Sequence, residues 1–233
     1  MRNYIILNGV NSNTITGLLI STLPPITKPK QRTETEEIDG RDGDIVTKLG
    51  YSAYDKEIEI GLYGDFDIDD VIAYFNSEGT VTFSNEPDKF YNYQILDQID
   101  YEKLIRFKTA TIKMHMQPFK YPVQEQTITL SGETTVQNAG NIYARPVLNI
   151  SGSGNIEINL NEQQIFEVDL GEDATSITID TNQMEAYNPN TTELMNRKVT
   201  GDYSLFKIGS GNNTVEITGT VTSATISNYT RWI

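Results

Sequence analysis

The chain has 233 residues, contains no cysteine and carries a formal net charge of −14 at pH 7. This length is sufficient for one large or two ordinary domains, and the lack of cysteine excludes disulfides, zinc–thiolate sites and cysteine nucleophiles. The excess of carboxylates argues against a surface that binds nucleic acid or an anionic bilayer, because both need clustered Lys and Arg. No apolar run is long enough for a signal peptide or a transmembrane helix, so we expect synthesis in the cytoplasm and no membrane insertion.

The first predicted elements are short strands over residues 4–7 and 18–23, and Pro24-Pro25 stops the second. The next stretch, residues 34–54, holds two turn-forming pairs, Asp39-Gly40 and Asp42-Gly43. Asp-Gly favours a hairpin turn because glycine accepts the positive φ that such turns require. An isolated two-stranded hairpin is marginal in water, so we expect this one to lean on its own domain or on a neighbouring subunit. An ordinary surface hairpin is the alternative.

A strand of strict alternation follows from Lys56, and it places Ile58 and Ile60 on one buried face. Residues 67–77 form the one convincing helix, which Asp67 or Asp69 is placed to cap and Gly79 to end. Further strands are predicted over residues 80–84, 90–99 and 104–116.

The second half of the chain is predicted to begin near Tyr121, because Pro118 and Pro122 interrupt the strand pattern there. The domains are therefore expected to be residues 1–121 and 122–233. Short strands are predicted over residues 127–130, 146–150, 156–160, 165–170, 176–179, 203–208, 215–218 and 222–226. Glycine-, asparagine- and serine-rich turns separate them, for example at residues 151–155 and 209–213. Strands at this spacing without helices between them predict an antiparallel sandwich and a mainly β protein.

Candidate chemical sites are few. Residues 65–69 imitate the start of a calcium loop, but Asp70 stands where an EF-hand needs glycine, and helix capping explains the aspartates better. His115 is the only histidine and lies in a predicted strand, which favours a structural role. Carboxylates are abundant, so a glycosidase pair stays open, but no particular pair is marked. We expect no catalytic residue, no metal and no cofactor.

Four aromatic residues of the second half could stack on sugar rings: Tyr187, Tyr203, Tyr229 and Trp232. Such residues are more often found in a core or at its rim. They nevertheless make a carbohydrate-binding sandwich the second hypothesis for this chain, with a glycoside hydrolase third.

An ordered set of motifs runs through the whole chain, and in this order the set is more specific than any member. The motifs in the first half are Asn8-Gly9, Leu23-Pro24-Pro25, Ile38-Asp39-Gly40-Arg41-Asp42-Gly43 and Gln117-Pro118-Phe119-Lys120-Tyr121-Pro122. Those in the second half are Asn138-Ala139-Gly140, Arg145-Pro146, Ser151-Gly152-Ser153-Gly154-Asn155, Ile177-Thr178-Ile179-Asp180 and Tyr229-Thr230-Arg231-Trp232. In these features the chain resembles the distal tail proteins of long-tailed phages, the Dit family of siphophage baseplates and tail tips.

The resemblance implies a β-rich first domain that assembles into a ring, usually a hexamer and possibly two stacked rings, around the tail channel. It implies a galectin-like sandwich for the second domain, and no enzymatic activity. The stretch 34–54 resembles the family's arm, which reaches the adjacent subunit. The arm residues expected at this interface are Glu34, Glu36, Ile38, Asp39, Gly40, Arg41, Asp42, Gly43 and Asp44.

The resemblance also implies partners and a location. The expected partners are the major tail or tube protein and a tail-associated lysin or a fibre or receptor-binding protein, at the virion tail tip. The basic cluster Lys28, Lys30 and Arg32 could meet the acidic arm of the next subunit, although exposed ion pairs usually contribute little. An acidic channel would let phage DNA pass without binding it.

Overall fold

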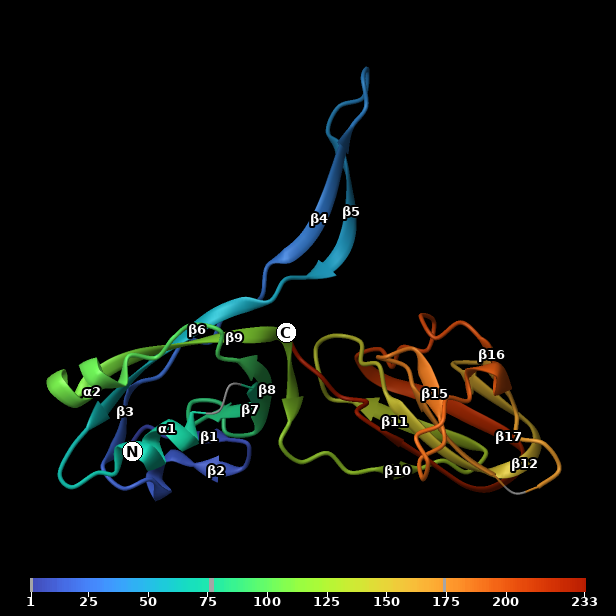
Figure 1. Ribbon diagram of the computed structural model, residues 1–233. Coiled ribbons are helices and arrows are strands. Elements are labelled where there is room, and N and C mark those ends of the chain that lie inside the picture. Colours follow the sequence, from blue (N-terminus) through green and yellow to red (C-terminus); the bar gives the residue numbers. More distant parts are fainter. Residues whose placement is uncertain (1, 76–77, 174) are drawn as a thin grey trace. The chain divides into compact units, whose positions relative to one another are not determined.

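The computed structural model describes residues 2–75, 78–173 and 175–233, and the chain divides into two units. The first unit ends at Val123 and the second comprises Gln124–Trp232. The boundary predicted from the sequence, near Tyr121, lies within the last residues of strand β9 (Figure 1). Both units are built mainly from antiparallel strands, so the expectation of a mainly β protein is confirmed.

The first unit is organised around a seven-stranded antiparallel sheet with the order β2-β1-β7-β8-β9-β6-β3. Its strands are β1 (Ile5–Leu7), β2 (Val10–Asn11), β3 (Leu18–Thr22), β6 (Tyr54–Leu62), β7 (Glu78–Phe83), β8 (Lys89–Gln94) and β9 (Thr109–Pro122). A single 3-10 turn, Ser12–Thr14, follows β2. In β6, the alternation predicted from sequence buries Ile58 and Ile60 completely and leaves Glu57 and Glu59 exposed. The inward side chains join Val71 and Leu104 in one core.

Two short helices cover this core. Helix α1 (Ile68–Tyr74) begins at Asp67, whose carboxylate accepts a hydrogen bond of 2.9 Å from the Asp69 amide. The predicted end at Ser77 lies outside the described residues. Gly79 does not end the helix. It lies in β7, where an added Cβ would collide with the Asn8 side chain.

Helix α2 (Tyr101–Phe107) corrects the prediction of a strand over residues 104–116, of which only the part from Thr109 is strand β9. The Asp100 carboxylate caps the helix by accepting from the Lys103 amide at 2.8 Å, and Lys108 ends it in the left-handed conformation. Only Leu104 is buried within α2. One inward side chain leaves too weak a helical period for the sequence to reveal the helix.

The second unit is a sandwich whose two layers share strands. Its strands are β10 (Ile128–Thr129), β11 (Glu133–Asn138), β12 (Val147–Leu160), β13 (Gln163–Asp169), β14 (Thr175–Asp180), β15 (Glu185–Tyr187), β16 (Val199–Gly201) and β17 (Gly211–Ser227), with a 3-10 turn at Asn196–Lys198. The first half of β12 pairs with β14, which pairs with β15, and its second half pairs with β13, which pairs with β16. Strand β17 follows β12 along nearly its whole length.

The glycine-rich segment 151–155, predicted to be a turn between two strands, is instead a corner within β12. The register with β17 shifts at Ser151/Gly152 and again at Ser153/Ile156, which marks bulges. Bulges bend a strand and increase its twist, so a single strand passes from one layer to the other. The predicted strands 215–218 and 222–226 are likewise parts of β17. Sequence patterns that favour a turn also suit such a corner, because both need glycine.

Close approach of β12 and β17 at the corner makes Gly152 sensitive to substitution. A Cβ at this position would lie 2.3 Å from the carbonyl oxygen of Thr220. We expect Gly152→Ala to lower the free energy of unfolding of the second unit by about 1–3 kcal/mol, as overpacking does. Urea unfolding measures the change. Gly209→Ala is the matched control, since its Cβ would meet nothing closer than 3.4 Å. Equal stability of the two variants would contradict the account of the corner.

Candidate functional site

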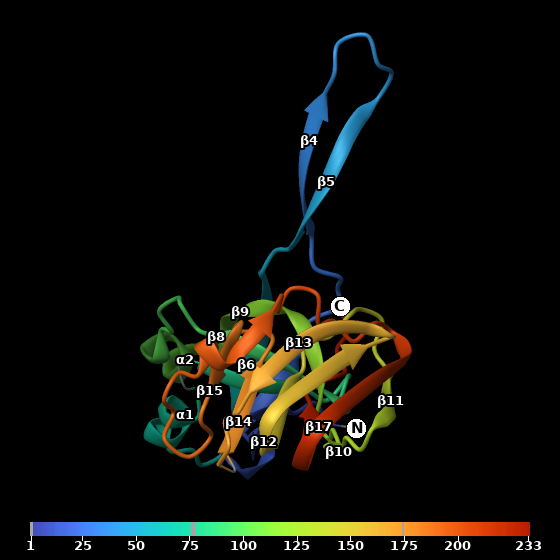
Figure 2. The same ribbon diagram turned by 90° about the vertical axis from the view of Figure 1, so that its right-hand side faces the viewer.

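The most prominent surface feature of the first unit is a hairpin of β4 (Gln31–Glu37) and β5 (Asp44–Tyr51), here called the arm. Among the described residues these two strands pair only with each other, from Gln31 opposite Tyr51 to Glu37 opposite Asp44. Figures 1 and 2 show the arm extending from the strands that carry it. It begins and ends three residues earlier than the stretch 34–54 expected from sequence.

The tip of the arm is a six-residue loop rather than a two-residue turn. The Arg41 amide donates to the Ile38 carbonyl oxygen at 3.1 Å, which closes a four-residue turn. Gly40 at its third position has a φ of 82°, and Gly43, just before β5, has a φ of 77°. Only glycine accepts such values without strain, so both Asp-Gly pairs set the course of the loop.

The arm exposes apolar and acidic side chains together. Ile38, Val46 and Leu49 have exposed fractions of 44 %, 53 % and 50 %. Thr35 lies opposite Val46 and Glu36 opposite Ile45, so apolar side chains lie on both faces of the ribbon. The arm's carboxylates are Glu34, Glu36, Glu37, Asp39, Asp42 and Asp44, all exposed. A two-stranded ribbon gains little stability from itself, and this surface is suited to burial against another chain.

Where the arm leaves the sheet, its two strands are joined and anchored. The Ser52 amide donates to the Lys30 carbonyl oxygen at 2.9 Å, so the entering and leaving chains are adjacent. The ring of Tyr51 meets that of Phe119 on β9 edge to face, with the ring centres 5.8 Å apart. The base of the arm is therefore held to the seven-stranded sheet.

The entering chain is held by two side chains of the sheet. Lys56 donates from Nζ to the Pro25 carbonyl oxygen at 2.6 Å, and Asn85 donates from Nδ2 to that of Pro24 at 3.1 Å. The Lys56 side chain is buried, and its ammonium lies about 5–6 Å from the ring centres of Tyr54, Phe83 and Tyr91. Proline has no backbone N–H to donate, so the paired prolines are held through their carbonyl oxygens, which accept these two hydrogen bonds.

A buried charge cluster surrounds Lys56. Glu86 accepts from Lys120 at 3.0 Å and from the Tyr91 hydroxyl. Burial lowers the pKa of Lys56 to about 8; Glu86 opposes this shift and Lys120 adds to it. Burial, with Glu86 adding to it, raises the pKa of Tyr54 to about 12, and the Tyr54 hydroxyl has no hydrogen-bond partner within the described part of the chain. We call the contacts of Lys56, Asn85, Tyr51 and Ser52 the arm root.

The other candidate residues do not assemble into a reactive centre. His115 lies opposite Asp55 on β6, with 2.8 Å between Nδ1 and the carboxylate, and Lys113 binds the same carboxylate at 3.0 Å. Hydrogen bonds from His115 and then Lys113 lower the pKa of Asp55. This is a solvent-facing ion cluster. Across residues 2–75, 78–173 and 175–233, no group of three or more His, Asp or Glu is arranged to hold a metal.

The aromatic residues proposed for glycan contact lie mostly in the sandwich core or at its edge. Tyr229 is buried and its hydroxyl donates to the Gln126 carbonyl oxygen at 2.8 Å. Tyr203 packs edge to face on Phe166, with the ring centres 5.1 Å apart. Tyr187 ends β15 and is half-buried, as is Trp232. Tyr203 and Tyr229 are therefore engaged by their own domain.

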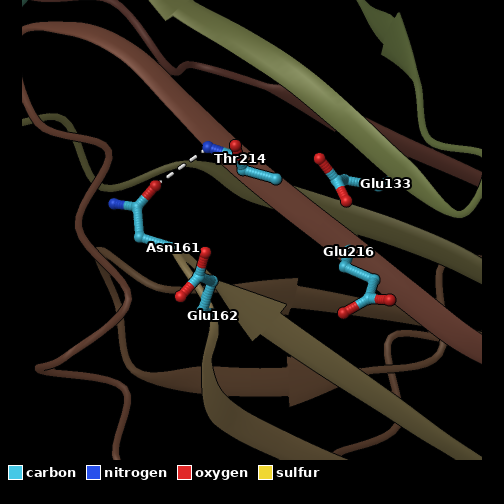
Figure 3. A pocket seen from close by; sticks show the side chains of 5 residues that line it. All are labelled: Glu133, Asn161, Glu162, Thr214 and Glu216. Atoms are coloured by element: carbon cyan, nitrogen blue, oxygen red, sulfur yellow. Dashed lines mark hydrogen bonds between the residues drawn. The ribbon is translucent and has the colours of Figure 1, made fainter.

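The second unit has a polar hollow of about 230 Å³ beside the β12–β13 turn (Figure 3). Glu133 and Glu216 enter it from directly opposite positions on β11 and β17, and Glu162 comes from the turn. Asn161 accepts from the Thr214 amide at 2.9 Å. The residues that line the hollow include no aromatic ring on which a sugar could stack.

No helix in the described ranges is both long and apolar enough to cross a bilayer.

Comparison with known proteins gives one domain family and one fold. Residues 11–116 match the family model of the phage tail protein RIFT-related domain. No curated protein sequence matches the chain. The crystal structure of the Dit protein (gp 19.1) of phage SPP1, described as a paradigm of the hub adsorption apparatus in phages infecting Gram-positive hosts, is similar over the whole of both chains, with a TM-score of 0.69 and 16 % identity.

Two structures of the phage P2 baseplate in its activated conformation also match. The one with Ca has a TM-score of 0.52 at 11 % identity, with 97 % of each chain covered. The one with Sr has a TM-score of 0.50 at 10 % identity, with 98 % of this chain and 99 % of that chain covered. At such identities the likeness shows the fold, which extends over both units.

The charge cluster at the arm root predicts a pH dependence. Lys56 has a pKa of about 8 in the folded chain against 10.5 for a free lysine. Between these values the unfolded chain holds a proton that the folded chain has lost, so the free energy of unfolding of the first unit rises with pH, by about 1–2 kcal/mol from about pH 8 to 9.5. Lys56→Met removes this rise.

Urea unfolding of the full chain at several pH values, followed by near-ultraviolet circular dichroism of the tyrosines, measures it. Lys113→Met is the control, because Lys113 is exposed on the neighbouring strand and its loss leaves the rise in place. A rise that survives in Lys56→Met would show that Lys56 is not the titrating group.

Proposed function

We propose that this chain belongs to the siphophage distal tail protein (Dit) family and is a structural hub at the tip of a phage tail, which the match of residues 11–116 and the fold support. In this proposal six copies form a ring through their first domains, and the ring joins the tail tube to baseplate or fibre proteins. The single observation that carries the proposal is the arm, an exposed hairpin whose apolar side chains its own chain does not cover.

A ring needs two different surfaces on each copy: a giving surface, which docks on the next copy, and a receiving surface, on which the previous copy docks. Such a head-to-tail interface either closes into a ring or grows into a filament. A projecting hairpin supplies the giving surface at little cost, since its strands are already paired and only side chains must be ordered on binding. The anchored base directs the arm, because Tyr51 and Lys56 tie both of its strands to the sheet.

The charge of the chain suits the passage of DNA. With 32 acidic and 18 basic residues, six copies carry a strongly negative surface. A channel lined by carboxylates repels phosphates and leaves the genome free to slide, whereas basic residues would hold it. DNA in this proposal passes through the ring without specific binding.

The proposed partners follow from the position at the tail tip. The ring's faces meet the major tail protein on one side and a tail-associated lysin, fibre or receptor-binding protein on the other. The protein is made in the cytoplasm of the bacterial host and acts in the virion. Binding of glycans by the sandwich is less well supported, because Tyr203 and Tyr229 pack into its core.

Removing the arm tests the proposal. The Ser52 amide and the Lys30 carbonyl oxygen are already hydrogen-bonded, so residues 31–51 are replaceable by an Asn-Gly turn without stretching the chain. We expect the parent protein to show a mass near six times 26.2 kDa, or a monomer–hexamer equilibrium, in size-exclusion chromatography with light scattering. The armless variant is expected to be a folded monomer over the same concentrations.

The matched control changes a hairpin turn elsewhere in the chain. Glu162→Gly turns the positive-φ pair Asn161-Glu162 into Asn-Gly, keeps the arm and is expected to assemble as the parent does. Circular dichroism confirms that both variants fold. A parent protein that stays monomeric at high concentration, or an armless variant that still forms hexamers, would refute the proposed role of the arm.

A further inference from the structure

Helix α2 presents a second exposed surface that combines apolar and cationic side chains. Leu96, Ile105 and Phe107 have exposed fractions of 70 %, 41 % and 60 %. Lys103, Arg106 and Lys108 follow one another within six residues and are also exposed. We call these six residues the α2 platform. Exposed aromatic side chains and arginine are enriched at protein–protein interfaces relative to the rest of a protein surface.

The cations of the platform are held close to aromatic rings. The Lys108 ammonium lies 4.2 Å from the ring centre of Phe66, and the Arg106 guanidinium lies 5.3 Å from that of Phe107. Such contacts restrict the long side chains and keep positive charge beside apolar surface. Three exposed acids, Asp97, Asp100 and Glu102, lie in the same stretch of chain. Asp100 caps the helix, Asp97 lies 3.6 Å from Lys113, and Glu102 lies in the first turn, whereas Arg106 and Lys108 lie at the other end of the helix.

A hollow of about 270 Å³ lies beside the platform. It is lined by Lys103 from α2 and by Thr109 and Thr111 from β9, together with Ser21, Glu59, Ile60 and Ala110. Glu59 is occupied there by the Thr22 hydroxyl, which donates to it at 2.7 Å. The hollow therefore offers an ammonium and two threonine side chains to an incoming polar chain, beside the Glu59 carboxylate.

We propose that the α2 platform receives the arm of a second copy of this chain. The two surfaces are complementary in kind: the arm presents six carboxylates around Ile38 and Val46, and the platform presents three cations around Ile105 and Phe107. Opposite charge steers the approach and sets the register, while the apolar contact supplies most of the affinity. This inference rests on the proposed function, since it names the receiving surface of the ring interface.

The positions of arm and platform suit a head-to-tail contact. Both are attached to the ladder of β6 and β9, which pairs from Tyr54 opposite Met116 to Gly61 opposite Thr109. The arm joins the Tyr54 end and α2 joins the Thr109 end. Eight residue pairs separate the two by about 25 Å. Giving and receiving surfaces at opposite ends of one ladder are what a closed ring requires.

The other candidate partner of the arm is the basic cluster Lys28, Lys30 and Arg32. This cluster lies at the arm's own end of the ladder. The cluster itself contains no apolar side chain, and the exposed apolar residue that precedes it in the chain is Ile26, with an exposed fraction of 57 %. It therefore offers charge with little apolar surface. The platform offers both, and the arm has both to bury.

Cysteine pairing between copies tests the inference without background, because the natural chain has no cysteine. Ile38→Cys protein is mixed with Phe107→Cys or Ile105→Cys protein, and disulfides are formed with a mild oxidant. Assembly brings the pair to a high effective concentration, so we expect about tenfold more covalent dimer than in the control mixture of Ile38→Cys with Leu205→Cys. Leu205 is equally exposed but lies in the second unit.

A third mixture, Ile38→Cys with Ile26→Cys, probes the basic cluster. Two outcomes would overturn the inference and leave the proposed ring unaffected. One is crosslinking to Ile26→Cys in place of the two α2 positions, and the other is assembled protein that crosslinks at neither α2 position. The absence of any assembly of the parent protein in light scattering overturns the proposed function itself, and the inference with it.

Arg106→Glu, an exposed change that leaves the fold intact, should shift the monomer–hexamer midpoint upward in concentration.

Discussion

The hydrogen bond from the Lys56 ammonium to the Pro25 carbonyl oxygen fixes the chain that enters the arm. A ribbon of two strands has no layer beneath it, so its direction is set only where it joins the sheet. Burying an ammonium costs free energy, and the surrounding rings and the Glu86 carboxylate offset part of that cost. The first unit thus tolerates the unfavourable burial of an ammonium at the point where the exposed arm leaves the sheet.

The strands β6 and β9 connect this anchor to the rest of the first unit. Strand β6 begins directly after the arm, and β9 begins directly after α2. Between the two ends runs a continuous ladder of paired residues. The same strands supply Ile58, Ile60 and Met114 to the core, so the spacing between arm and platform is as rigid as the core itself.

The sequence predicts those parts that local chemistry decides. The alternation at Ile58 and Ile60, the cap at Asp67 and the hairpin at the Asp-Gly pairs all follow from neighbouring residues. The alternation of side chains along a strand also places Lys56 on the same face as Ile58. Its partners are far away in the chain, however: Pro25 comes before the arm and Glu86 follows α1. No local pattern shows that these groups meet.

The same reason explains what was missed. Helix α2 has one buried side chain, Leu104, and its outward residues continue an apolar pattern that is typical of a strand. The platform was overlooked with it, although the cap at Asp100 and the cations after it were a usable signal. At Gly152 a corner and a turn require the same residue, and only pairing with β17 distinguishes them.

The long pairing of β12 with β17 ties together parts of the chain that are far apart in the sequence. Val147 lies opposite Ser227 at one end of the pairing, and Leu160 lies opposite Val215 at the other. Closing loops of this length costs conformational entropy before the paired residues can offset it. We therefore expect the formation of this pair of strands to be the slow step when the second unit folds.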